Sequence, residues 1–319
     1  MRGGSLMRYK LLVCLIAAIL LSGCSVDTKA TEKQVAEVAS PNIQIDNSSQ
    51  KVWDLFTERN GVSVEGLLGL PQEPDLFPLY LEGLKHSSPL VRWYSANQLI
   101  EYAYEDNKNI IIEGLEKLQN DSDEKVRTAA AFALSAITKS FEGDRFKKTT
   151  DGKKVAFYKY DEAIYNDGII YLYIDDSQDA WYEYDIDGSI TDLTWAPDGN
   201  KLCVEYGGRS WSFVSLVDLN NSQVVDVGLI SHIMKNHEKL GYKLVENPRS
   251  DPRVTLLEWS PKSDRILLFY SFTDDDLKLQ SGTAIYNVSK DNFESIKPYP
   301  EEADEGVEPR KPEDFTWSN

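Results

Sequence analysis

The sequence predicts an α+β protein of two folded domains, a small α-helical repeat domain followed by an all-β antiparallel domain. Apolar residues recur with a helical period from about residue 51 to 142, and from about residue 150 to 319 they alternate with a period of two. A length of 319 residues gives room for about two domains. The apolar share of 41% suits a globular chain that buries a core.

Residues 1–23 have the pattern of an export signal. Basic residues precede eleven apolar ones, Leu11 to Leu21, and at about 1.5 Å per residue this run is too short to cross a hydrocarbon core of roughly 30 Å. It closes on Leu-Ser-Gly-Cys, which resembles the lipobox of bacterial lipoproteins. The resemblance implies cleavage before Cys24 and a diacylglyceryl group on its sulfur, hence a lipid anchor to the cell membrane on the extracytoplasmic face. An ordinary secretory signal with a chance cysteine stays open, as does a start at Met7.

The chain is strongly acidic. Its formal net charge is −18, and the first 23 residues hold three basic and no acidic side chains, which leaves 31 basic against 52 acidic residues in the rest. A field of this sign repels phosphate backbones and anionic headgroups, so we expect neither nucleic-acid binding nor a polybasic membrane patch. We expect partners that are neutral, cationic or of mixed charge.

Residues 24–50 are polar and lack a sustained apolar period, which predicts a flexible tether. Cys14 would leave with the signal and Cys24 would carry lipid, so Cys203 would stand alone without an internal disulfide. The apolar neighbours of Cys203 favour a small buried side chain over a reactive thiol.

Two stretches of the helical domain repeat each other, residues 88–99 and 123–134, at a shift of 35. The aligned pairs are Val91 and Val126, Arg92 and Arg127, Ala96 and Ala131, and Leu99 and Leu134. Ser88 and Asp123 are N-cap residue types, and Pro89 suits the first helical position. We expect Val and Leu to form the seam between the units and Ala to let the helices approach.

The pattern resembles HEAT repeats over about residues 75–140, which implies stacked helical hairpins in a small domain at 51–142. Residues 51–61 and 64–70 could supply a capping helix pair. A generic bundle of α-hairpins stays open as the alternative.

From about residue 150 onward, short runs rich in β-branched and aromatic residues are divided by Gly, Asp and Asn. We expect about eleven strands, and their close spacing predicts antiparallel meanders instead of β-α-β crossovers. Residues 230–244 interrupt the strands with a helical pattern.

Two of these strands end in a Trp followed by a tight turn. Trp195 precedes Pro-Asp-Gly, and Trp259 precedes a similar turn in which Ser263 or Asp264 replaces the glycine. The motif resembles the repeat of TolB-like β-propellers. The resemblance implies that residues 150–319 form propeller blades.

Trp317 aligns with these two residues, so residues 314–316 are expected to be the edge of a further strand. The spacings of 64 and 58 residues between successive Trp exceed the roughly 40 to 45 of a compact blade. An early stop, a last strand that closes onto the first sheet and a chance Trp in a frayed tail all stay open. About eleven strands make fewer than three full blades, and closed propellers need about four. We therefore predict an open or incomplete array.

The sequence predicts no catalytic, cofactor-binding or metal-binding residues. It holds no G-x-S-x-G motif, so the propeller resemblance carries no peptidase activity. His237 begins an H-E-x-x-H pattern that has Gly in place of the second ligand, and His232 lies about 140° from it around a helix. For His86 we expect a solvated or capping role.

Acidic turns and aromatic pairs are the remaining candidates. The acidic turns do not match the spacing of a calcium loop, so we expect them to be solvated; they are Asp175, Asp176, Asp179, Asp185, Asp187 and Asp274 to Asp276. We expect most of the aromatic pairs to pack between sheets or blades and the exposed minority to make protein or glycan contacts; they are Trp93 with Tyr94, Tyr171 with Tyr173, and Tyr182 with Tyr184.

The leading hypothesis is a non-enzymatic, lipid-anchored module that binds a protein or a cell-envelope component. A structural or sensory lipoprotein cannot be told apart from it by sequence. The alternative is an envelope hydrolase, in which two carboxylates of the β-domain converge and one has a raised pKa.

Overall fold

The computed structural model describes residues 49–58, 76–158, 168–175, 180–242, 251–299 and 309–317. The predicted signal, Cys24 and the tether up to residue 48 lie outside the described residues, as do residues 64–70 of the expected capping pair.

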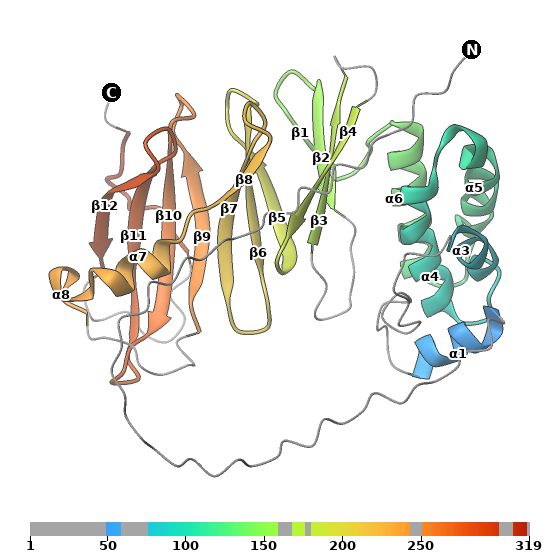
Figure 1. The fold of residues 1–319 in the computed structure, drawn as a ribbon, viewed down its shortest axis with the longest axis horizontal. Helices are drawn as coiled ribbons and strands as arrows, with labels where there is room; N and C mark the ends of the chain where they lie inside the picture. The colour runs from blue at the N-terminus through green and yellow to red at the C-terminus, as the bar shows by residue number, and fades with distance from the viewer. Residues whose placement is uncertain are drawn as a thin grey trace, which may run out of the picture. The chain divides into compact units, whose positions relative to one another are not determined.

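In the described residues, the helical domain contains two helical hairpins with a further helix beside them (Figure 1). Its elements are α1 Ser49–Glu58, α3 Phe77–Gly83, α4 Pro89–Gln98, the 3-10 turn η1 Leu99–Tyr102, α5 Glu105–Leu118 and α6 Glu124–Thr138. Helix α1 begins two residues inside the segment assigned to the tether, because Trp53 and Phe56 give it an apolar face that the domain buries.

The repeated positions form the core of this domain as predicted. Val91, Val126 and Leu99 are fully buried, and Leu134 is 9% exposed. Asp123 caps α6 by accepting the N–H groups of Lys125 and Val126 at 2.9 and 3.2 Å. The two N-caps differ, since Ser88 makes no side-chain cap bond.

The aligned arginines bind equivalent turns. Arg92 donates from Nη1 to the carbonyls of His86 and Ser87, six and five positions before it, at 2.8 and 2.9 Å. Arg127 does the same at 2.7 and 3.1 Å. Arg92 alone also forms a bidentate pair with Asp121, at 2.7 and 2.8 Å, and the two side chains are 13% and 8% exposed. This pair joins the second helix of one repeat to the turn of the next, and the hydrogen bond from Arg92 lowers the pKa of Asp121.

The described strands of the β-domain form three four-stranded antiparallel meanders, called here blades 1, 2 and 3 (Figure 1). Blade 1 is β1 Lys147–Lys148, β2 Lys154–Tyr158, β3 Gly168–Ile174 and β4 Ala180–Ile186. Blade 2 is β5 Ser189–Trp195, β6 Lys201–Gly207, β7 Ser212–Asp218 and β8 Gln223–Asp226. Blade 3 is β9 Arg253–Trp259, β10 Arg265–Thr273, β11 Leu279–Asn287 and β12 Asn292–Pro298.

The expected count of fewer than three blades was wrong because β1, only two lysines long, has no apolar signal. It places the start of the β-domain ahead of the predicted boundary at residue 150. The described strands do not close into a ring: blades 2 and 3 share one parallel bridge, Ser212 to Arg253, and blades 1 and 3 share no ladder. Helices α7 Leu229–Lys235 and α8 His237–Leu240 lie between blades 2 and 3 in the chain, within the predicted helical insert apart from Leu229.

The same turn follows the first strand of each blade. In each, the residue after the strand donates its N–H to the residue that opens the next strand, at 2.9 to 3.0 Å: Thr149 to Lys154, Ala196 to Lys201, and Ser260 to Arg265. The left-handed position has φ of 73°, 66° and 59°, at Gly152, Gly199 and Ser263. Ser263, not Asp264, therefore replaces the glycine. Its hydroxyl accepts the N–H of Asp198 at 3.0 Å, which links the turns of blades 2 and 3.

The turn tryptophans link each blade to the one before it. Trp195 donates from its indole N–H to the carbonyl of Lys147 in β1 at 2.8 Å. Trp259 donates to the carbonyl of Thr194 in β5 at 3.3 Å. Lys147 and Thr194 hold the same place, one residue before the end of the first strand, so the contact repeats with the blades.

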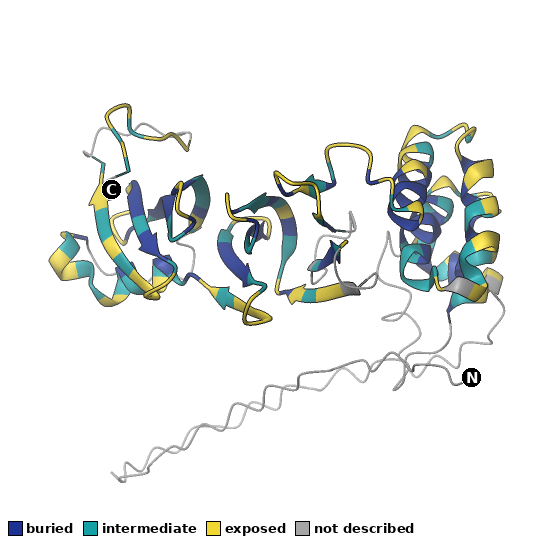
Figure 2. Ribbon diagram, turned by 90° about the horizontal axis from the view of Figure 1, so that it is seen from above, coloured by how far each residue is buried: buried dark blue, intermediate teal, exposed yellow. Residues whose placement is uncertain are grey.

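Alternate residues of a strand point to opposite faces of its sheet. Buried residues lie along the strands of the blades (Figure 2). Ala156, Ile170 and Leu172 of blade 1 pack against blade 2. The residues that alternate with these along the strands point to the other face of blade 1. They pack on α6 and on the segment after it, in a cluster formed by Phe132, Ala136, Phe141, Phe146, Val155, Phe157, Tyr171 and Tyr173. Helix α6 thus belongs to the cores of both domains.

We expect Arg92→Met to lower the free energy of unfolding by about 3 kcal/mol, because it leaves the carboxylate of Asp121 buried and unpaired. Arg127→Met should cost about 1 kcal/mol, because it loses only bonds to a turn. Urea denaturation measures the free energy of unfolding of both variants. Equal losses of stability would contradict the assignment of Arg92–Asp121 as the stronger contact. Since the folded pKa of Asp121 is lowered, the excess cost should hold at neutral pH and disappear as the pH falls through that lowered value.

Candidate binding groove beside helix α6

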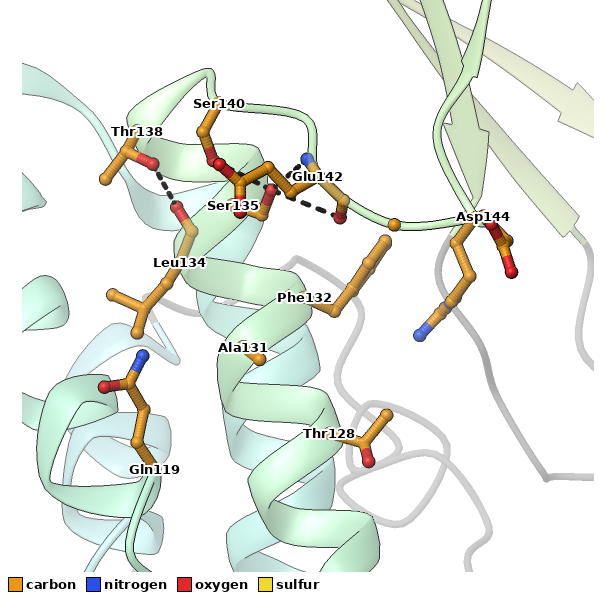
Figure 3. A pocket seen from close by; sticks show the side chains of 12 residues that line it. Gln119, Thr128, Ala131, Phe132, Leu134, Ser135, Thr138, Ser140, Glu142 and Asp144 are labelled. Atoms are coloured by element: carbon orange, nitrogen blue, oxygen red, sulfur yellow. Dashed lines mark hydrogen bonds between the residues drawn. The ribbon is translucent and has the colours of Figure 1, made fainter.

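A groove of about 620 Å³ runs along the outer side of α6 (Figure 3). Helix α6 forms one wall, Gln119 at the end of α5 faces it, and the segment after α6 closes one end. Its lining includes Thr128, Ala131, Leu134 and Thr138 from the helix, and Ser140, Glu142, Asp144 and Arg145 from the following segment.

The position of Ala131 explains why this side of α6 is open. The aligned Ala96 is fully buried in the core of the helical domain. Ala131 is exposed together with Thr128 and Thr138 on one side of the helix. The prediction that both alanines lie between helices is right for Ala96 and wrong for Ala131. A third repeat would pack on this side, but the chain enters the β-domain after α6.

Ser135 fastens the segment that closes the groove. Its hydroxyl accepts the N–H of Glu142 at 2.6 Å and lies 3.0 Å from the hydroxyl of Ser140. Phe141 has a φ of 48°, a strained value for an aromatic residue. Its ring is only 5% exposed and packs on that of Phe146 at 5.5 Å. Burial of the ring holds the strained backbone in place, so the closing wall is preorganised.

The groove combines an apolar floor with an acidic rim. The guanidinium group of Arg145 lies 3.6 Å over the ring of Phe132 and donates to the carbonyl of Tyr158 at 3.2 Å. Glu142 and Asp144 are exposed at the rim. Among the described lining residues, the cation Arg145 is therefore held against the protein, while the carboxylates of Glu142 and Asp144 are exposed. This chemistry suits a segment that carries both an apolar and a basic side chain.

Comparison with known families gives a match within the helical domain. Residues 111–141, which cover most of α5 and all of α6, match the HEAT repeat family. No curated protein sequence matches the chain.

Solved structures similar to part of the chain include proteins with a β-propeller domain. The β-propeller domain of the Trilobed protease from Pyrococcus furiosus is 14% identical, with a TM-score of 0.32 over 49% of this chain and 43% of that one. A proposed TolB from Agrobacterium tumefaciens is 13% identical, with a TM-score of 0.28 over 47% and 46% of the two chains. The acylaminoacyl peptidase of Pyrococcus horikoshii is 11% identical, with a TM-score of 0.30 over 46% and 24%. The chain thus spans less than half the length of these proteins.

The three histidines lie apart and have structural contacts. His86 accepts the N–H of Ser88 on Nδ1 at 3.1 Å and so caps its turn. His232 packs on the ring of Phe293 at 4.7 Å, and burial lowers its pKa. His237 places Nδ1 2.9 Å from the carbonyl of Met234. Within the described ranges, no cluster of three or more His, Cys, Asp or Glu side chains could hold a metal ion. The helices of those ranges include none that is long and apolar enough to span a membrane.

The acidic turn residues that the structure describes are exposed, with the exception of Asp274. Asp175, Asp185, Asp187, Asp275 and Asp276 are exposed. Asp176 and Asp179 lie outside the described residues. Asp274 is only 4% exposed, so the expectation of a solvated turn was wrong for it. Its carboxylate accepts the N–H of Lys278 at 2.9 Å and the amide of Gln280 at 2.7 Å, which closes the β10–β11 hairpin.

Most of the aromatic candidates are buried, but the four buried ones pack in the helical core or on α6 and not between sheets or blades as predicted. Trp93, Tyr94, Tyr171 and Tyr173 are at most 8% exposed, whereas Tyr182 is 39% exposed. Tyr171 and Tyr173 pack on helix α6 and not on another sheet. The hydroxyl of Tyr171 donates to Glu101 at 2.6 Å, and burial raises the pKa of Tyr171 well above its usual value.

Cys203 is fully buried on β6, as expected for a small apolar side chain. Burial raises the pKa of its thiol well above the usual value, so the reactive thiolate is suppressed.

The sequence reasoning missed a carboxylate pair, Asp192 and Glu205, which face each other across β5 and β6. Burial raises the pKa of Glu205 to about 7, and the charge of Asp192 adds to the effect. Glu205 also accepts hydrogen bonds from β9, at the backbone of Leu256 and the side chain of Thr255. Asp192 pairs with Lys147 at 3.0 Å. The signal in the sequence was one Glu within an apolar strand, but the pairing depends on a bulge in β5 that no pattern revealed.

We expect the stability of the protein to fall as the pH rises from about 5 to 8. The folded pKa of Glu205 is about 7 against an ordinary 4.5, so the folded state binds the proton more tightly. Its stabilising contribution is complete below pH 4.5 and is lost as the pH rises through 7, a change on the order of 2 to 3 kcal/mol.

Glu205→Gln should remove this dependence and be more stable than the wild type at pH 8. Thermal melting across the pH range measures this dependence of stability on pH. Substitution of the exposed Glu183 by Gln is the control. A wild-type profile that the Glu205 variant leaves unchanged would refute the assignment.

Proposed function

We propose that the protein is a non-enzymatic binding module, anchored by lipid on Cys24 to the extracytoplasmic face of the cell membrane. Its groove beside α6 binds an extended polypeptide segment of a partner protein or cell-envelope component. That segment presents an apolar residue to the floor and a Lys or Arg to the rim.

The observation that carries this proposal is the exposed side of α6 at Thr128, Ala131 and Thr138. Packing another helix is the ordinary use of this side in a helical repeat, and here it lines a groove of about 620 Å³. The charge of the rim and the net charge of −18 favour a cationic partner. A tether of some 25 residues spans roughly 25 to 30 Å, which would hold the domains close to a membrane.

The anchor is tested with the two cysteines of the predicted mature chain. Cys24→Ser should abolish incorporation of labelled palmitate and move the protein from the membrane to the soluble fraction, because no site for acylation remains. Cys203→Ser, the matched control, should label and sediment as the wild type does. Membrane retention of the Cys24 variant without label would contradict lipid anchoring.

The groove is tested by photo-crosslinking in membranes of the source cell. A benzoylphenylalanine at position 131 should crosslink a partner peptide that contains Lys or Arg. The same probe at Asn109, an exposed position of α5 outside the groove, should not. Reversing the rim with Glu142→Lys and Asp144→Lys should reduce the crosslink at least fivefold. Equal crosslinking at both positions, or a yield insensitive to rim charge, would contradict the proposal.

The second candidate is the envelope hydrolase, and the Asp192–Glu205 pair favours it. Glu205, whose pKa is raised to about 7, lies across from a second carboxylate, Asp192, and a general acid and its partner need such a pair of carboxyl groups. Both carboxylates are also engaged in structure, Asp192 with Lys147 and Glu205 with β9, so we rank this function below binding. Hydrolysis of cell-envelope glycans that Glu205→Gln abolishes would reverse the ranking.

A further inference from the structure

The face of blade 3 that points away from blade 2 is buried. Ile266, Leu268 and Tyr270 of β10 pack toward blade 2. Their alternates Leu267 and Phe269 point to the other face, yet they are only 1% and 2% exposed. This outer face of blade 3 therefore has a cover, although no further blade follows among the described strands.

The C-terminal segment 309–317 contacts this outer face at Glu258 and Arg265. Residues 314–316 form no strand, so the expected strand edge was wrong. Trp317 nevertheless donates from its indole N–H to Glu258 Oε1 at 3.2 Å. Glu258 directly precedes Trp259, just as Thr194 precedes Trp195. Trp317 thus contacts blade 3 at the position that Trp259 contacts on blade 2.

Further contacts fix the segment. The ammonium group of Lys311 pairs with the second carboxylate oxygen of Glu258. The guanidinium of Arg265 lies 5.4 Å from the ring centre of Trp317. Phe315 packs edge-on against Trp317 at 5.0 Å and lies under Lys311 at 5.4 Å. Lys311, Phe315 and Trp317 therefore form one interlocked unit centred on Glu258 and Arg265.

We propose that the outer face of blade 3 is a docking surface for a Lys-x-x-x-Phe-x-Trp segment, and that residues 309–317 occupy it as a strap. The strap takes the place of the first strand of a following blade without forming its ladder. It shields the apolar outer face of blade 3, which would otherwise be an exposed sheet face at the open end of the array. The docking depends on indole and carboxylate contacts instead of backbone pairing, so the strap is exchangeable.

The test uses the full chain and a fluorescein-labelled peptide of residues 309–317, followed by anisotropy. The peptide should bind the Trp317→Ala protein at least tenfold more tightly than the wild type, in which the strap competes for the surface. Adding Glu258→Gln to the Trp317→Ala protein should weaken binding about tenfold. Near-ultraviolet circular dichroism checks that each variant is folded, as expected since Trp317 is only half-buried.

Two peptide variants complete the test. A peptide with Ala in place of Trp317 should not bind, whereas one with Gln in place of Glu313 should bind normally, because Glu313 is exposed. Equal binding to the wild-type and Trp317→Ala proteins, or no binding to either folded protein, would overturn the proposal. Unchanged binding after Glu258→Gln would also overturn it.

Discussion

The packing of helix α6 on two domains at once is the constraint on which the rest of the structure depends. One side of the helix carries Val126, Ala130 and Ala133 into the helical core, and another carries Phe132 and Ala136 into the core with blade 1. The bond from Tyr171 to Glu101 adds a polar tie between the same domains. The β-domain contacts α6 at Phe132 and Ala136, and no further described helix packs on the side that holds Thr128, Ala131 and Thr138. The side that neither domain uses becomes the groove.

The blades follow a second repeated constraint, the indole bond from each turn tryptophan to the preceding blade. A donor with one fixed direction and an acceptor in the backbone sets the spacing and order of neighbouring first strands. In blade 1, Lys148 stands at the position of the turn tryptophan, so β1 has no indole to bond to an element before it. The face of blade 1 that points away from blade 2 packs instead on α6 and on the aromatic segment after it. Blade 3 has no successor among the described strands, and Trp317 meets it instead. Both ends of the array are thus covered by elements that are not blades.

The repeats themselves were accessible to sequence reasoning because they are local. The shift of 35 residues pairs side chains that one helical period brings to one face, and the turn after Trp195 needs residues with particular backbone preferences. The same reasoning failed at Ala131 and at β1. Ala131 has the sequence context of Ala96, and its exposure depends on which element follows α6. Strand β1 consists of two lysines whose conformation is imposed by pairing with Val155 and Ala156.

The sequence by itself determined the fold class, the order of the domains, the tight turns and the acidic character of the surface, because periodicity, turn chemistry and charge are properties of neighbouring residues. Only the tertiary structure decided where the groove opens, that Glu205 meets Asp192 beside β9, and that Trp317 contacts Glu258. Each of these joins residues that are distant in the chain or changes their exposure. Their energies come from burial and from hydrogen bonds between packed elements, and neither exists until the elements are assembled.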